Sequence, residues 1–161
     1  MKEWRKRPRE IANNFNPAFC GELIYYVVED YYKIKKDGMP FLLLPFVLPI
    51  ILHKATRDRI ESSRTHMSVW LQRNPQVKIN FGHRVNNLLD ITLEAYVFLI
   101  EYNVIKIKEG KLFIINKPIK RKADTLHEET KACIGKAKVI GKWFARANDI
   151  GTVYVMWGVK P

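Results

Sequence analysis

Six residues of this chain belong to the types that most often bind metals or act as nucleophiles and bases: Cys20, Cys133, His53, His66, His83 and His127. No two histidines stand at the helical or hairpin spacing of a metal site, and the two cysteines are far apart with no other thiol near either. This spacing predicts no metal site, no cofactor and no disulfide framework.

The other candidates for chemistry are carboxylates and one segment of glycines and lysines. Asp58 and Glu61 are interleaved with arginines, as on a solvated helix face, and Glu128-Glu129 suits the start of a helix. The segment "GKAKVIGK" (135–142) lacks the glycine spacing and the hydroxyl of a phosphate-binding loop. The sequence therefore predicts a protein that is not an enzyme.

Positive charge is the strongest signal in the composition. The 161 residues carry a formal net charge of +12, from 28 basic and 16 acidic side chains. Residues 106–146 alone hold 12 of the basic and 4 of the acidic side chains. Such a concentration is typical of a protein with an anionic partner, which is a nucleic acid, an acidic protein face or a membrane surface.

Seven basic residues of this region are candidates for contact with nucleic acid or an acidic partner. They are Lys106, Lys108, Lys111, Lys131, Lys138, Lys142 and Arg146. The first three belong to a predicted hairpin, and the other four recur along one face of a predicted helix. A solvated, solubilising surface is the alternative that the sequence leaves open.

The elements that must position these residues begin with a helix and an apolar segment. Residues 16–38 predict a helix that Asn16 caps, with Pro17 at its first position and Gly38 after its last turn. The uncharged segment "MPFLLLPFVLPIIL" (39–52) is too short to cross a bilayer and contains three prolines, so we expect it to be buried. The charged N-terminus leads into no apolar stretch of a secretory signal, which favours a cytoplasmic protein.

A helix-turn-helix is predicted in the middle of the chain. One helix is expected to begin at Thr56, which would cap it. Residues 81–103 are expected to form two helices with a break at residues 90–92, where Thr92 would cap the second.

Residues 104–115, "VIKIKEGKLFII", predict a two-stranded hairpin. A two-residue turn at Glu109-Gly110 places Lys108 opposite Lys111. The same register pairs Ile107 with Leu112, Lys106 with Phe113 and Ile105 with Ile114. The four aliphatic side chains then share one face of the hairpin, and three lysines and a phenylalanine share the other.

A long amphipathic helix and an apolar tail are predicted at the C-terminal end. The helix is expected over residues 125–149, where Thr125 and Glu128 have the spacing of a capping box. Its buried face would contain Cys133, Ala137, Ile140, Phe144 and Ala147. The tail "TVYVMWGVKP" (152–161) is apolar enough that it must dock on the rest of the chain.

These elements predict a mostly α protein with a small β-hairpin. We expect a winged helix-turn-helix domain with an N-terminal helical unit and a long C-terminal helix. The expected boundaries are residues 1–60 for the N-terminal helical unit, 61–118 for the winged helix-turn-helix, and 119–161 for the basic amphipathic helix and apolar tail.

The helix that would read the major groove is poorly suited to DNA. The segment "TLEAYVFLIEYN" (92–103) contains Glu94 and Glu101 but no lysine or arginine, whereas base edges are usually read by Arg, Lys, Asn or Gln. A net negative surface would weaken contact with phosphates. We therefore expect the wing to make non-specific phosphate contacts or to dock onto a protein, and not to read bases.

Four segments resemble the middle component of bacterial three-component ABC systems, which contain an SMC-like ATPase. They are "RPREIANNFNPAFCGELI" (7–24), "GMPFLLLPFVLPIILHKATRD" (38–58), "GKWFARA" (141–147) and "TVYVMWGVKP" (152–161). The resemblance covers nearly the whole chain. It marks nine residues as family motif and candidate partner interface: Arg7, Pro8, Asn16, Pro17, Phe19, Pro49, His53, Lys54 and Arg57.

The resemblance implies a non-enzymatic accessory subunit. Such a subunit would dock on an SMC-like ABC ATPase and link it to an effector, commonly a nuclease, in anti-phage or anti-plasmid defence of the Lamassu kind. Sequence-independent contact with double-stranded DNA would be an added role of the basic residues. The main alternative is a stand-alone winged-helix DNA-binding transcriptional regulator, and a peripheral membrane protein that uses its basic face is a more distant one.

Overall fold

The computed structural model describes residues 15–118 and 126–160. In chain order the elements are α2 (Pro17–Lys35), β1 (Met39–Pro40), η2 (Phe41–Leu43), α3 (Leu44–Ile51), α4 (Lys54–Arg57), α5 (Met67–Arg73), η3 (Pro75–Lys78), α6 (Phe81–Glu101), β2 (Ile105–Lys108), β3 (Lys111–Ile114), α7 (Glu128–Arg146) and α8 (Ile150–Trp157). The protein is mostly α with a small antiparallel sheet, as predicted. Within the described ranges, no helix is both long and apolar enough to cross a membrane.

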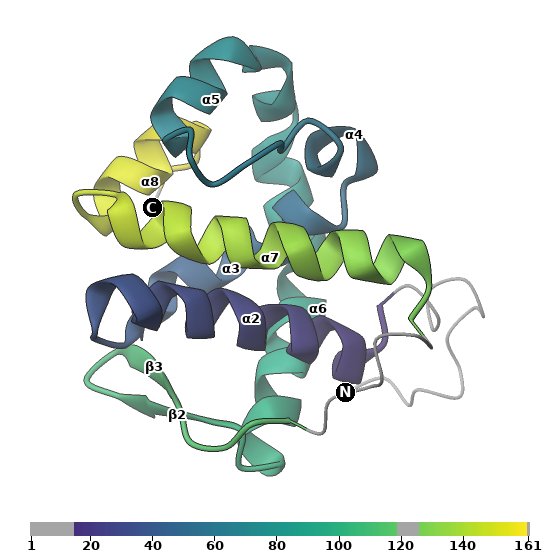
Figure 1. Cartoon of the computed structure of the whole chain (residues 1–161), viewed down its shortest axis with the longest axis vertical. Coiled ribbons are helices and arrows are strands. Elements are labelled where there is room, and N and C mark those ends of the chain that lie inside the picture. Colours follow the sequence, from purple (N-terminus) through teal and green to yellow (C-terminus); the bar gives the residue numbers. More distant parts are fainter. Residues whose placement is uncertain (1–14, 119–125, 161) are drawn as a thin grey trace.

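Helices α2 and α7 lie side by side across the middle of the molecule, and α6 crosses behind them (Figure 1). The sheet lies beyond α2, and α4 and α5 lie beyond α7. The two central helices approach each other closely at Gly141, where a Cβ atom would stand 2.4 Å from the carbonyl oxygen of Val27. Only glycine allows the two backbones to meet at this point.

The N-terminal helix forms as the sequence predicts. The side chain of Asn16 accepts a hydrogen bond from the N–H of Ala18 at 2.8 Å, and Pro17 occupies the first turn of α2. The helix ends at Lys36, whose φ of 56° is left-handed. More than one face of α2 is buried, because α3, α6, α7 and the sheet all contact it.

The hairpin forms in the predicted register, from Lys108 opposite Lys111 to Ile105 opposite Ile114. A third strand, β1, was not predicted; it pairs with β3 and gives the sheet order β1-β3-β2. Helix, strand, helices and hairpin in this order, with this strand order, broadly fit a winged helix. In that arrangement α6 occupies the position of the helix that would read DNA.

The predicted break between two helices in residues 81–103 is wrong, because α6 runs unbroken from Phe81 to Glu101. Thr92 is fully buried, and its hydroxyl donates to the carbonyl oxygen of Leu88 at 2.8 Å. A threonine bonded in this way to the previous turn stays inside a helix and caps nothing. The chain turns before α6 instead, at Asn80, whose φ is 56°.

The helix predicted to run from Thr56 to Asn74 forms only in its last part, as α5, and Thr56 does not cap it. Thr56 lies inside the short helix α4, is buried, and places its hydroxyl 2.8 Å from Nδ1 of His53. The chain between α4 and α5 is not helical. Tryptophan indoles from α5 and α7 donate to its carbonyl oxygens at Arg59 (2.9 Å) and Thr65 (2.8 Å), so carbonyls that a helix would use internally are satisfied from outside.

The long C-terminal helix is confirmed as α7, which ends at Arg146. Four of the five residues predicted for its buried face are buried, namely Cys133, Ala137, Ile140 and Phe144. Ala147 follows the helix and is half-buried. The predicted capping residue Thr125 lies outside the described residues.

The apolar tail docks as expected, but it does so as the helix α8. Asp149 caps this helix by accepting a hydrogen bond from the N–H of Thr152 at 2.8 Å. Val153 and Trp157 are buried, and the indole of Trp157 stacks on the ring of Phe81 at 4.3 Å between centroids. The tail therefore closes the core over the start of α6.

Buried hydrophobic side chains form one continuous core. The apolar segment predicted to be buried contributes α3, in which every residue except Pro45 is buried. Residues from all three predicted units contribute to this core. The division at residues 60 and 118 remains a prediction.

Candidate functional site

Helix α6 offers little positive charge to a DNA backbone. Arg84 is the one lysine or arginine within this helix. Its guanidinium is hydrogen-bonded to the segment that precedes the helix. It donates to the carbonyl oxygens of Val77 (2.6 Å) and Ile79 (2.8 Å). It also lies 5.3 Å from the centre of the Phe81 ring. The acidic residues of the helix are Asp90, Glu94 and Glu101.

The hairpin keeps two of its three candidate lysines exposed to solvent. Lys106 and Lys108 are exposed, and no described side chain pairs with either. Lys111 forms an ion pair with Asp37, which raises the pKa of Lys111 and lowers the pKa of Asp37. Asp37 was not among the predicted site residues, although it lies only two residues before β1.

The four candidate residues of α7 all have partners within the chain. Lys131 pairs with Glu128, Lys138 lies over the ring of Tyr26, Lys142 lies 3.7 Å from Asp30, and Arg146 donates to the carbonyl oxygen of Ser63. Asp30 is a buried carboxylate that was not among the predicted site residues, and Lys33 also pairs with it at 2.6 Å. Two of these basic side chains therefore bind α7 to α2, and their contact with an external partner remains a prediction.

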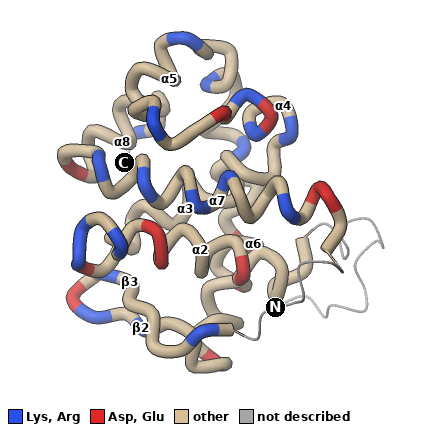
Figure 2. The backbone as a smooth tube through the Cα atoms, viewed as in Figure 1, with Lys and Arg blue, Asp and Glu red and all other residues tan. Residues whose placement is uncertain are grey.

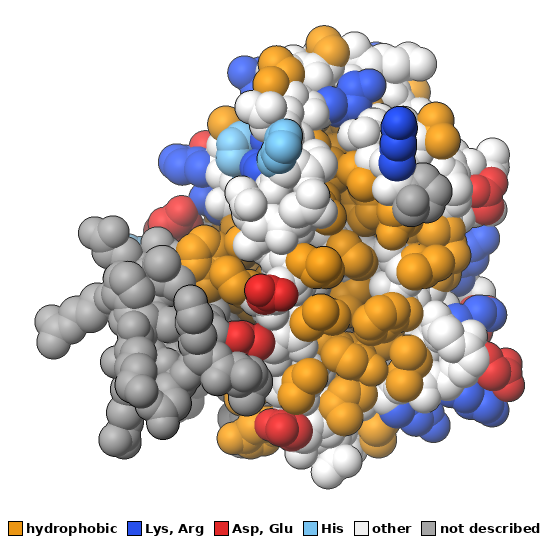
Figure 3. Space-filling model, turned by 180° about the vertical axis from the view of Figure 1, so that it is seen from behind, with side chains coloured by type: hydrophobic (Ala, Val, Ile, Leu, Met, Phe, Trp, Pro, Cys, Tyr) orange, Lys and Arg blue, Asp and Glu red, His pale blue; other side chains and the backbone are white. Residues whose placement is uncertain are grey.

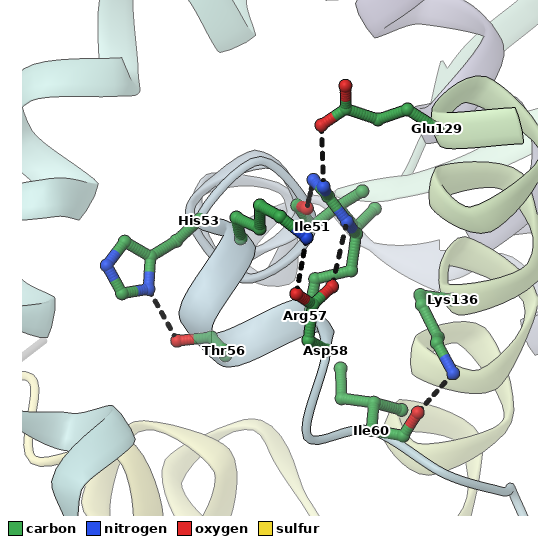
Figure 4. Close-up of polar contacts among 9 residues, drawn as sticks. Ile51, His53, Thr56, Arg57, Asp58, Ile60, Glu129 and Lys136 are labelled. Atoms are coloured by element: carbon green, nitrogen blue, oxygen red, sulfur yellow. Dashed lines mark hydrogen bonds and ion pairs between the residues drawn. The ribbon is translucent and has the colours of Figure 1, made fainter. Parts of the chain in front are cut away.

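Three of the motif residues, His53, Lys54 and Arg57, belong to α4 and its N-cap, and Figure 4 shows the contacts of Arg57. Arg57 was predicted to lie on a solvated face, but it is only 3% exposed. Its guanidinium donates to the carbonyl oxygen of Ile51 at 2.9 Å and to Glu129 Oε1 at 2.8 Å. Its Nε lies 4.0 Å from Asp58. Arg57 thus joins the end of α3 to the first turn of α7.

The neighbouring motif residues stabilise the same turn. Lys54 forms an exposed ion pair with Asp58 at 2.6 Å. His53 contacts Thr56 through Nδ1, and its burial, together with the charge of Arg84, lowers the pKa of His53. Both contacts lie within α4 and its flanking residues, so they stabilise this short helix, whereas Arg57 connects it to the end of α3 (Figure 4).

The other motif residues are distributed over the start of the chain. Asn16 and Pro17 begin α2, and Phe19 is half-buried on the core. Pro49 is buried inside α3. Arg7 and Pro8 lie outside the described residues. Pro49 therefore serves the packing of the core, and whether these positions also meet a partner remains a prediction.

The thiols are poorly placed for nucleophilic chemistry. Burial raises the pKa of Cys20 to about 12 and also raises the pKa of Cys133. A thiol with a raised pKa is protonated near neutral pH and is a weak nucleophile. In the part of the chain that the structure describes, no three His, Cys, Asp or Glu side chains come together as metal ligands.

Comparison with known proteins gives one match. The sequence profile of the ABC-three component (ABC-3C) system Middle Component 3 family matches residues 4–161. No curated protein and no solved structure matches the chain. Because the profile covers almost every residue, the chain belongs to the Middle Component 3 family of ABC-three component systems.

Proposed function

We propose that this chain is a non-enzymatic accessory subunit of a cytoplasmic complex. It docks on the SMC-like ABC ATPase of its system and links that ATPase to an effector, commonly a nuclease, in anti-phage or anti-plasmid defence of the Lamassu kind. Membership of a middle-component family supports a role beside other components. The main support for the proposal is the surface of α6. This helix presents apolar and acidic side chains where a DNA-reading helix would present basic ones.

Contact with double-stranded DNA is a secondary part of this proposal. Exposed Lys106 and Lys108 on the hairpin favour it. Lysines bind phosphates without reading bases, so this contact is independent of sequence. The same residues would serve a stand-alone regulator, but such a protein would also be expected to have basic groups on α6, where Arg84 instead donates to carbonyl oxygens of the chain itself.

The test is coexpression of the full chain, carrying an affinity tag, with the ATPase and effector encoded beside it. We expect the three proteins to remain together through affinity and size-exclusion chromatography at moderate salt. Recovery of the tagged chain as a lone monomer contradicts the proposal. A discrete footprint on its own promoter supports the regulator instead.

A further inference from the structure

Hydrophobic side chains gather on the outer surface of α6, as Figure 3 shows from behind. Leu93 and Val97 are 38% and 39% exposed. At about 100° per residue, they fall within one sector of the helix together with half-buried Leu89, Tyr96 and Ile100. This sector lies next to the buried residues of α6, about a third of a turn around the helix axis.

Two other elements extend this hydrophobic surface beside α6. The ring of Phe41 in η2 packs edge-on against Tyr96 at 5.2 Å, and its neighbour Leu42 is 57% exposed. The hydroxyl of Tyr154 in α8 donates to the carbonyl oxygen of Leu42 at 2.8 Å. We call the surface formed by Phe41, Leu42, Leu93, Tyr96, Val97 and Tyr154 the α6 face.

The α6 face stands on a rigid base. Thr92, Ala95 and Leu99, which follow the hydrophobic sector of α6 around the helix on the side of Tyr96, are fully or almost fully buried. The face joins residues from three separate elements that share one core. It therefore exists before any partner arrives, and binding there would cost little conformational entropy.

Acidic side chains line one edge of the face. Asp90 and Glu101 are exposed and follow Val97 around the helix, and Glu94 comes next beyond them. Figure 3 shows acidic groups in a row beside the hydrophobic surface. On a chain whose formal net charge is +12, this local negative charge repels DNA and anionic lipid. It favours a partner that carries positive charge beside an apolar surface.

We propose that the α6 face binds an amphipathic helix of another component of the system. The apolar stripe of that helix packs on Leu93, Tyr96 and Val97, and its flanking lysines or arginines pair with Asp90 and Glu101. A helix suits the site because the exposed residues recur at three- and four-residue steps along α6, as in packing of ridges into grooves. This inference rests on the proposed function and assigns it a surface.

A second copy of this chain is a poorer occupant. Antiparallel pairing of two α6 helices across this face sets the acidic edge of one against the acidic edge of the other. Like charges in such an interface oppose binding. A partner helix with basic residues would instead place positive charge beside Asp90 and Glu101, which favours binding.

Substitution of matched valines tests the surface. Val97→Glu places a charge on the face, on the side that borders the acidic edge. Val69→Glu places one on α5 at a valine of nearly equal exposure, 37% against 39%. Binding of the full chain to the purified ATPase and effector is measured by biolayer interferometry. We expect Val97→Glu to weaken binding to one component at least tenfold, and Val69→Glu to change it by less than about twofold.

A charge variant tests the acidic edge. Asp90→Lys with Glu101→Lys is expected to weaken binding about three- to tenfold, mainly by slowing association, and to reduce its salt dependence. Circular dichroism and the melting temperature establish that each variant is folded. If Val97→Glu fails to fold, Leu93→Ala with Val97→Ala replaces it, because alanine preserves the helix.

The outcomes separate this inference from the proposed function. If the wild-type chain binds the other components and the α6 variants bind equally well, the surface is wrong and the proposed function stands. If the wild-type chain binds neither component, both fail. If the wild-type chain sediments as a dimer that Val97→Glu dissociates, while its binding to the other components is unchanged, a second copy occupies the face and the inference is overturned.

Discussion

Arg57 shows how strongly one buried cation can tie distant segments together. It stands in a charged stretch of sequence that looks solvated, yet it connects the carbonyl end of α3 to Glu129 of α7. Burial of a guanidinium is tolerated when its hydrogen bonds are made within the protein. Arg57 therefore contributes to stability mainly because its acceptors, above all the carbonyl oxygen of Ile51, would have no donor without it.

Replacement of Arg57 by methionine keeps most of the side-chain volume and removes the charge. We expect Arg57→Met to lower the free energy of unfolding by about 1–3 kcal/mol, because the buried carbonyl oxygen of Ile51 loses its donor. Lys54→Met, which breaks only an exposed ion pair, is the control and should cost less than about 1 kcal/mol. Urea denaturation measures both, and equal losses would contradict a special role for Arg57.

His53 gives the protein a pH-dependent contribution to stability. Its pKa in the folded chain lies below its usual value of 6.5. As the pH falls through 6.5, the unfolded chain takes up a proton that the folded chain resists, so stability decreases toward lower pH. We expect His53→Gln to flatten this decrease. Urea denaturation at several pH values measures the free energy of unfolding. The same dependence of this free energy on pH in the wild type and His53→Gln would refute the prediction.

At the scale of elements, the close packing of α2 on α7 depends on the position of one glycine. Gly141 faces the backbone of α2, whereas nothing lies within 4 Å of a Cβ built on Gly135, two turns earlier. The same substitution in the same helix should therefore act in opposite directions.

We expect Gly141→Ala to destabilise the protein by about 1–3 kcal/mol, because the two helices must separate to admit the methyl group. Gly135→Ala should stabilise it by up to about 1 kcal/mol through helix propensity. Thermal unfolding followed by circular dichroism gives both signs. Stabilisation by Gly141→Ala would show that the helices are not packed as described.

Local patterns predicted the elements whose signals lie within a few residues. The hairpin register follows from the Glu109-Gly110 turn and alternation, and α2 follows from Asn16 and Pro17. The missed features depend on contacts distant in sequence. β1 exists because Met39 pairs with Leu112, and Thr92 remains inside a helix because tertiary packing buries it. The burial of Arg57 likewise required Glu129 to be placed beside it.

At the scale of the whole molecule, basic side chains are spread over the chain while α6 remains acidic (Figure 2). The motif residues Arg57 and Pro49 belong to the core, and the hairpin lysines remain outside it. Family membership could be proposed from the sequence segments, whereas the α6 face could not, because three separated elements build it.

We expect the purified chain to bind double-stranded DNA weakly and without preference for sequence. Lys106→Gln with Lys108→Gln should reduce the slope of log affinity against log salt by about two, because two phosphate contacts are lost. Lys54→Gln, an exposed lysine on α4 far from the hairpin, is the control (Figure 1). Fluorescence anisotropy with two unrelated duplexes provides the measurement. Clear discrimination between the duplexes would favour the regulator.

The packing of α2 on α7 has a consequence for biosynthesis. α2 leaves the ribosome before the helix that covers it, which begins only at Glu128. Until α7 emerges, the apolar side chains of α2 lack their main cover, and the nascent chain is exposed to aggregation and to chaperones. A truncated product that stops before α7 is therefore expected to be insoluble, so only chains that include α7 would reach assembly.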